Sequence, residues 1–428
     1  MVSSATTADT VANGRLTRQQ GRQWTMAIFV IFFICGISIA SWLARIPAVR
    51  DSLGASTFKM GMLIVGLSVG SMIGLALSSH VIARIGAKRT MYIVLTVMLA
   101  GLVVVGLGSI APSYPLILLG LLMFGLGTST NDVAMNLSGA ANERVMGRTL
   151  MPLFHALFSL GTVAGAGLGA LAERAHVPVV WHLIAIAVVA MVAALWALPQ
   201  VQPESLGVSD EEAAQDEVQD GGWRQRLAVW KQPGTLLIGL IVLGMAFAEG
   251  SAGDWLALGM VDDRGTSKAT GALIYAVFVA AMTVGRVAGV FALDRFGRVP
   301  VLRATAVTAL LGLALVIFVP FIWAAVIGTV LWGLGASLGF PVGMSAAADD
   351  PRNAAARVSA VATIGYLAFL VGPPGLGLLG EHVGLLNALI VVMVLIAAAV
   401  FAAPAARERH RVVAPAGTDR AGVAPTGR

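Results

Sequence analysis

Long apolar segments alternate with short polar ones along nearly the whole chain. Each is close to the roughly 20 residues that a helix needs to cross the hydrocarbon core of a bilayer. The twelve segments fall at residues 24–46, 59–82, 91–110, 115–136, 150–172, 178–198, 234–257, 270–292, 300–320, 322–345, 357–379 and 383–404. A polar stretch at about 199–233 divides them six and six. The pattern predicts an all-α polytopic membrane protein with twelve transmembrane helices in two six-helix halves.

Composition supports this assignment. Of the 428 residues, 57% are hydrophobic and only 12% are charged, against about 25% charged in a soluble domain. A soluble multidomain protein is therefore excluded. The pI near 10 is better explained by basic residues retained on the cytoplasmic side of a membrane than by a nucleic-acid partner. The single Cys35 excludes an internal disulfide.

The polar segments define the expected organisation. We expect a cytoplasmic N-terminal tail (1–23), the first half (24–198), a cytoplasmic linker (199–233), the second half (234–404) and a cytoplasmic C-terminal tail (405–428). The first apolar segment is too long for a signal-peptide core, so we expect it to remain as a helix. Of the 28 Lys and Arg residues, those in the predicted outer loops are Arg45, Arg50, Lys59, Arg174, Arg264 and Lys268. This bias predicts that both termini lie in the cytoplasm. We expect the protein to reside in a bacterial-type cytoplasmic (inner) membrane.

The two halves repeat one another. Gly74 and Gly86 are separated by twelve residues, as are Gly285 and Gly297. Ser41-Trp42 before one loop is echoed by Asp254-Trp255, and Gly-Leu-Gly at 125–127 by Gly-Leu-Gly at 333–335. Parallel repeats of this kind are typical of transporters whose substrate site lies between the halves.

A charged loop between the eighth and ninth predicted helices, residues 290–298, reads Val-Phe-Ala-Leu-Asp-Arg-Phe-Gly-Arg. It resembles the signature loop of the major facilitator superfamily. The first-half counterpart, residues 79–89, keeps its basic residues, but Ala83 replaces the acidic one. The resemblance extends over essentially the whole chain and implies the major facilitator fold. The loop residues to which it assigns a gating role are Asp294, Arg295 and Arg298.

A narrower resemblance rests on the fourth predicted helix, where an acidic residue stands four positions before an asparagine (Asp132 and Asn136). This segment is similar to the fucose-permease branch of the superfamily. Together with Ser-Trp-x-x-Arg-Ile-Pro at 41–47 and Glu-Gly-Ser-x-x-Asp-Trp at 249–255, it looks most like the YbjJ-like inner-membrane proteins. The resemblance implies proton-coupled transport more strongly than it implies a sugar.

Ionisable residues inside membrane spans are costly and mark a pathway or a proton relay by default. Asp132 and Asn136 share one face of their helix, so the carboxylate is a candidate proton carrier and the amide a candidate substrate ligand. His155 lies at a similar depth on the next helix. We therefore hypothesise a coupled proton site of Asp132 and His155. The alternatives are a helix-capping aspartate and a histidine packed between helices.

Two more charged residues lie deep in the second half. Glu249 is in the middle of the seventh predicted helix and is a candidate proton or substrate ligand. Arg286, in the eighth, is a candidate for binding an anionic substrate. Each has a structural alternative, in which the residue pairs with an opposite charge or polar group on a neighbouring helix.

An outer gate is predicted from the internal repeat. Arg45 and Asp254 lie near the outer ends of the first and seventh helices, which are counterparts, and we expect them to pair when the cavity faces inward. Trp42 and Trp255 are the aromatic residues beside them, placed to stack on a sugar ring. The alternative is an interfacial Trp and a snorkelling Arg at the membrane surface.

The chain has no phosphate-binding loop of the Gly-x-x-x-x-Gly-Lys type and no His or Cys pair at metal-ligand spacing. We therefore expect no enzyme, no cofactor and no metal. The predicted function is proton-coupled symport of a small, sugar-like solute by a monomer in the lipid bilayer. Proton-driven efflux of a drug or metabolite is the alternative. A membrane sensor or assembly partner without transport is disfavoured by the retained deep charges.

Overall fold

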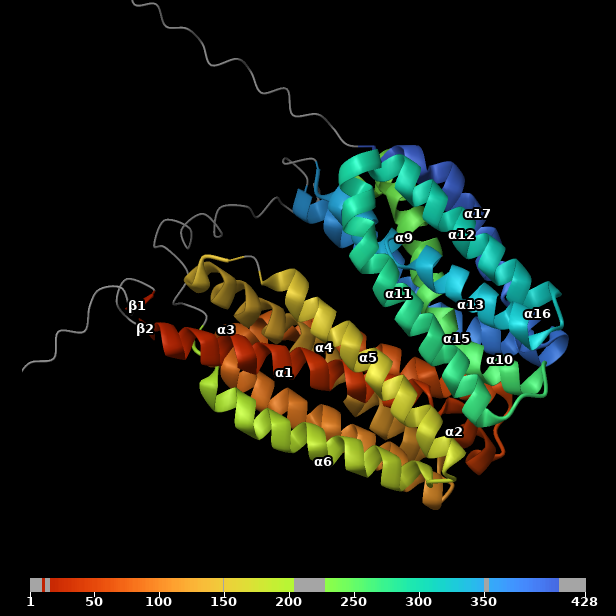
Figure 1. The fold of residues 1–428 in the computed structure, drawn as a ribbon, viewed down its shortest axis with the longest axis horizontal. Helices are drawn as coiled ribbons and strands as arrows, with labels where there is room; N and C mark the ends of the chain where they lie inside the picture. Colours follow the sequence, from red (N-terminus) through yellow and green to blue (C-terminus); the bar gives the residue numbers. More distant parts are fainter. Residues whose placement is uncertain (1–9, 12–15, 149, 204–227, 350–353, 408–428) are drawn as a thin grey trace, which may run out of the picture.

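In the computed structural model the chain forms two helical bundles, one from each half of the sequence (Figure 1). The structure describes residues 10–11, 16–148, 150–203, 228–349 and 354–407. The predicted central linker and both tails therefore lie largely outside the described residues. The N-terminal bundle contains α1 (Arg18–Leu43), α2 (Ile46–Leu53), α3 (Thr57–Ile110), α4 (Tyr114–Met146), α5 (Met151–Arg174) and α6 (Val179–Ala197), followed by η2 (Leu198–Gln200).

The C-terminal bundle repeats this arrangement with more interruptions. Its elements are η4 (Val229–Lys231), α9 (Pro233–Ser251), η5 (Ala252–Leu256), α10 (Ala257–Asp262), α11 (Lys268–Phe296), α12 (Arg298–Phe318), α13 (Ile322–Ala336), α14 (Gly339–Ala347), α15 (Ala354–Val383), α16 (Leu385–Ala388), α17 (Ile390–Ala402) and η6 (Ala403–Ala406). Among the described residues, eleven helical segments are long and apolar enough to cross a membrane. One of them, α3, consists of two helices joined at a kink, so the predicted twelve spans are confirmed.

The kink in α3 and its counterpart show the internal repeat in the backbone. Gly86, inside α3, has φ of 79°, and Gly297, between α11 and α12, has φ of 76°. Residues with a side chain rarely adopt this region. The hydropathy pattern predicts a break over residues 83–90. The structure places it at Gly86, where the backbone leaves the helical conformation.

The first helix begins earlier than expected, at Arg18 rather than residue 24. Thr17 and Gln20 form a capping box, in which each side chain bonds the backbone N–H of the other. Such a box satisfies N–H groups that a helix start leaves open. A short antiparallel pair, β1 (Thr10–Val11) with β2 (Leu16–Thr17), precedes it and was not predicted.

The two bundles converge at one end and diverge at the other (Figure 1). We call the end with α2, α10 and α16 the distal end, and the end with β1, β2 and the C-terminus of η6 the proximal end. The bonds that link described residues of different halves involve α2, the first turns of α3, α10, the start of α11 and the distal part of α15. The distal end is therefore the closed end.

Candidate functional site

The deep charges of the C-terminal half form an ion pair. Glu249 lies in the last turn of α9, and its Oε1 is 3.0 Å from Nη2 of Arg286 on α11. Both side chains are about one-third exposed, so the pair is reachable by solvent. Arg286 thus neutralises a carboxylate of its own half, which is the structural alternative to binding an anionic substrate.

A π-helical turn follows Glu249 directly. Residues Ala252–Leu256 form η5 and carry Asp254. Single π-turns inside α-helices are rare and frequently occur at functional sites. The carboxylate of Asp254 has no hydrogen bond or ion pair with any described residue, although the buried Tyr275 on α11 lies within electrostatic range of both Asp254 and Glu249. The C-terminal half therefore holds two carboxylates near one tyrosine, and one of them, Glu249, is paired with Arg286.

In the N-terminal half, Asp132 and Asn136 are joined along α4. The Nδ2 of Asn136 donates to the backbone carbonyl of Asp132 at 2.8 Å and to its carboxylate at 3.1 Å. Asp132 is exposed. Cys35 on α1 and Tyr366 on α15 lie within electrostatic range of it. Because Tyr366 belongs to the other half, Asp132 faces the interface between the halves.

His155 also faces the other half. Its ring packs edge-on against Phe32, with the centroids 5.2 Å apart, and it lies within electrostatic range of Arg286. No hydrogen bond or ion pair joins Asp132 and His155 among the described residues, and their coupling stays a prediction.

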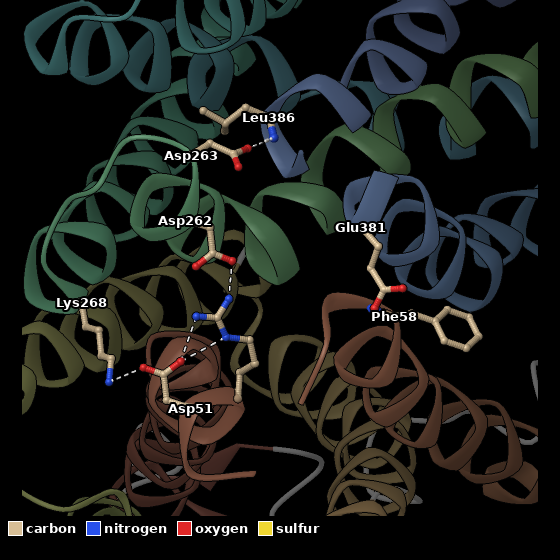
Figure 2. Close-up of polar contacts among 8 residues, drawn as sticks. Asp51, Phe58, Asp262, Asp263, Lys268, Glu381 and Leu386 are labelled. Carbon is tan, nitrogen blue, oxygen red and sulfur yellow. Dashed lines mark hydrogen bonds and ion pairs between the residues drawn. The ribbon is translucent and has the colours of Figure 1, made fainter. Parts of the chain in front are cut away.

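The distal end is held closed by a charge network between the halves (Figure 2). Arg50 on α2 pairs with Asp262 at the end of α10, and Asp51 pairs with Lys268 at the start of α11, at 2.6 Å. Arg50 also bonds its neighbour Asp51 at 2.8 Å. The four charges alternate in sign across the interface, and we call them the distal network.

A second link lies on the opposite side of the distal end. The carboxylate of Glu381 on α15 accepts a hydrogen bond from the backbone N–H of Phe58 at 3.0 Å (Figure 2). Deeper along the same two helices, the Ser68 hydroxyl donates to the carbonyl of Phe369 at 2.6 Å. Between these bonds a Cβ on Gly61 would lie 2.5 Å from the carbonyl oxygen of Pro373. The backbones of α3 and α15 are therefore in direct contact.

Asp51 lies on α2, outside the membrane-spanning helices. Burial by itself raises the pKa of Asp51, but hydrogen bonds from Lys268 and Arg50 outweigh that effect and hold the pKa below its ordinary value. The carboxylate is thus charged at neutral pH, and its two pairs are fully formed there.

Comparison with known proteins fits this two-half arrangement. The Major Facilitator Superfamily profile matches residues 26–253 and again residues 253–427. A relative from Sinorhizobium fredii, described as the uncharacterized transporter y4wD, is 31% identical over 372 residues, covering 85% of this chain and 95% of the relative.

The chain belongs to the Major Facilitator Superfamily.

It is therefore a multi-pass membrane transporter, and members of this superfamily bind small-molecule substrates. Two solved structures share the fold. A mutant of the nucleoside transporter NupG has a TM-score of 0.72 at 13% identity and covers 90% of this chain and 98% of its own. A mutant of the E. coli fucose:proton symporter FucP has a TM-score of 0.61 at 14% identity, with the same two coverages.

The predicted outer gate of this superfamily member needs correction. Arg45 is 2% exposed; its Nη1 lies 3.3 Å from Glu173 and its Nη2 donates to the carbonyl of Val177 at 2.5 Å. Both partners belong to its own half, so the predicted pairing with Asp254 is wrong in this conformation. The repeat indicates the right pair of loops, but the charges that meet lie further along the chain, at Arg50 and Asp262.

The predicted aromatic stack is also not available here. Trp42 is fully buried and Trp255 is 1% exposed. A Cβ on Gly377 would lie 3.1 Å from the Trp255 ring, which shows that this ring packs against α15 inside the closed distal end. Neither ring has a free face for a substrate in this conformation.

The signature loop holds its own half together. Arg298 bonds Asp349 at 2.5 Å and the Ser345 hydroxyl at 3.0 Å. Arg295 stacks over the ring of Phe296, 5.4 Å from its centroid, and Asp294 is exposed. The partners named here, Asp349, Ser345 and Phe296, all belong to the C-terminal half.

The distal network and two buried partners of the site were not predicted from the sequence. Asn131, fully buried, donates to the sulfur of Cys35 at 3.1 Å, and Tyr275 lies beside both C-terminal carboxylates. A signal for the network was present, because Arg50 and Asp262 are 212 residues apart, which falls within the spacing of the repeat. Counterpart positions of opposite charge predict a pair near a pseudo-twofold axis.

Proposed function

We propose that this protein is a proton-coupled symporter for a small hydroxylated solute, working by alternating access. The proximal end faces the cytoplasm of a bacterial inner membrane, and the structure is the conformation closed to the outside. One chain suffices as the working unit, because its two halves supply both walls of the site.

The observation that carries the proposal is the accessibility of the deep charges while the distal end is closed. Asp132 and His155 are exposed on one half, and Glu249 and Arg286 are about one-third exposed on the other. Charges at this depth are costly in a bilayer. A site that protons and a polar solute reach from one side at a time accounts for that cost.

The groups that face the interface between the halves suit a hydroxylated solute. Asn136 offers amide donors and an acceptor, and Tyr366 a hydroxyl that both donates and accepts. Trp42 and Trp255 are enclosed, so stacking is left to a conformation with the distal end open. The fold likeness to a fucose:proton symporter supports, by analogy, a hydroxylated solute moved together with a proton.

Proton flux into liposomes tests the proposal. The reconstituted protein, with a pH dye in the lumen, is offered sugars, polyols and small acids one at a time. We expect one class to acidify the lumen. Asp132→Asn should abolish acidification but keep counterflow of the labelled solute, because exchange requires no net proton movement.

Arg174→Gln is the matched control, since Arg174 is exposed at the distal end and has no ion pair among the described residues. It should behave as the wild type. Counterflow without acidification in the wild type would refute proton coupling. If no compound of the panel acidifies the lumen and the protein extrudes an amphipathic dye in a proton-driven manner, efflux would be established instead.

A further inference from the structure

A pocket lies on the C-terminal half, apart from the central site. It is formed between α11, α12 and α13 and has a volume of about 370 Å³. Its wall on α11 consists of small residues, Gly285, Ala288, Gly289 and Ala292. Arg286 on the same helix points to Glu249. At 100° per residue, Ala292 lies about 120° around α11 from Arg286. The pocket therefore opens on another side of the helix.

The pocket occupies the depth of one bilayer leaflet. Phe296 and Pro300 line it where α11 ends and α12 begins, at the proximal end. Gly285 is eleven residues further in, which corresponds to roughly 16 Å of helix. The hydrocarbon core is about 30 Å thick, so the groove spans about half of it. The exposed edge is formed by Ala288 and Ala304, so in a membrane an acyl chain has access to it.

The wall of this groove differs in sequence from its counterpart in the N-terminal half. Counting from the paired glycines, Gly74 and Gly285, the N-terminal counterparts of three wall residues are bulkier. Ala288, Gly289 and Ala292 correspond to Leu77, Ser78 and Val81. Beside Gly285 and Gly289 the space is taken by Ser337 and Leu338, so the open part of the groove lies toward Ala288 and Ala292.

Two arginines flank the lining residues at the proximal end of the groove, Arg295 next to Phe296 and Arg303 next to Ala304. Arg295 and Arg303 are exposed, and neither has an ion pair with a described residue. Arg295 is within about 20° of Ala288 around α11, whereas Asp294 is about 140° from Gly289. The nearby carboxylate on α11 therefore turns away from the mouth, and Asp349 is already paired with Arg298.

We propose that this groove binds one anionic phospholipid of the leaflet at the proximal end. An acyl chain lies along the small-residue wall of α11, and Arg295 and Arg303 hold the phosphate. Arginine near the headgroup level attracts anionic lipid, and its planar donors suit a phosphate. The inference does not depend on the transported solute.

Native mass spectrometry of the full-length protein in detergent tests this assignment. The probes are phosphatidylglycerol and phosphatidylcholine with the same palmitoyl and oleoyl chains. We expect one phosphatidylglycerol to be retained in preference to phosphatidylcholine. The variant Ala288→Leu/Ala292→Val, which introduces the residues of the N-terminal half, should lose that bound lipid. Arg295→Gln/Arg303→Gln should lower the preference by about 25-fold, at about fivefold for each arginine.

The matched control is Arg84→Gln/Arg89→Gln, which removes two exposed basic residues from the counterpart loop of the N-terminal half. It should keep the bound lipid. Equal retention of both lipids by the wild type, or an unchanged preference in the groove-filling variant, would overturn the proposal. Thermal unfolding in detergent identifies variants that fail to fold. If the groove-filling variant fails to fold, the arginine variant still decides the test, because its substitutions lie on the surface.

Discussion

Replacing Arg50 by glutamine is expected to release the distal end of the molecule. Arg50 connects α2 of the N-terminal half to Asp262 at the end of α10, and it also orients Asp51, which binds Lys268. The substitution leaves a shorter, still polar side chain and removes the charge. Both inter-half pairs of the distal network are therefore weakened by one change.

The magnitude follows from how sheltered the pair is. The side chains of Arg50 and Asp262 are 17% and 25% exposed. Fully exposed ion pairs contribute about 0.2–1 kcal/mol, and hydrogen bonds to charged groups contribute about 1.5–3 kcal/mol. A partly sheltered pair at the protein edge falls between them, at about 1 kcal/mol. The ratio of distally open to distally closed molecules should thus rise about fivefold.

Distances between spin labels measure this ratio. We choose cysteines at Ala175 and Asn387, which are exposed at the distal end of opposite halves, in a Cys35→Ala background. We call these the distal labels. Arg50→Gln should increase the population of the longer distance about fivefold at low salt and less at high salt, because screening already weakens the pair.

The double variant Arg50→Gln/Asp262→Asn decides whether the ion pair is responsible. If it is, the double variant should open no further than Arg50→Gln alone. Arg174→Gln removes a distal charge without a partner among the described residues and should leave the distances unchanged. Equal opening in Arg50→Gln and Arg174→Gln would refute the reasoning, because net charge would then explain the effect.

Three further results are expected. Glu249→Gln should lower the free energy of unfolding, measured by chemical denaturation, by about 1–2 kcal/mol, since it leaves Arg286 unpaired at a half-buried site. The double variant Glu249→Gln/Arg286→Gln should recover part of this loss. Measured with the distal labels, distal closure should be constant from pH 7 to 5 and weaken only below about pH 4. The lowered pKa of Asp51 keeps its ion pairs intact at every pH above the ordinary pKa of an aspartate. Opening near pH 6 would show that a titratable group other than Asp51 controls closure. Gly61→Ala should populate the open distance, because its Cβ meets the carbonyl of Pro373, whereas Gly167→Ala, with open space around it, should not.

The fold was largely predictable because it rests on features that sequence alone carries. Twelve apolar segments and the repeated glycines fix the number of spans and the division into halves. The junction at Gly86 was predicted less closely. Hydropathy predicts a polar interruption over residues 83–90, and the structure joins the two helices of α3 at Gly86.

The site was predictable as a set of residues but not as a set of contacts. Burial cost identified Asp132, His155, Glu249 and Arg286 without any knowledge of geometry. Which of them meet depends on the rotation of each helix, and a rotation of 100° separates neighbours in sequence. Depth alone therefore does not decide pairing, as Arg45 shows by pairing with Glu173 of its own half.

The partners found in each half separate the expected roles of the two deep carboxylates. Glu249 is neutralised by Arg286 at 3.0 Å, so a proton that binds it must also release a guanidinium. The Asp132 carboxylate accepts a hydrogen bond from the Asn136 amide and has no ion pair with a described residue, so a proton changes its charge without breaking an ion pair. We therefore expect Asp132→Asn to abolish coupling while the protein stays stable, and Glu249→Gln to affect stability and solute affinity together. The reverse pattern would assign the proton to the C-terminal half.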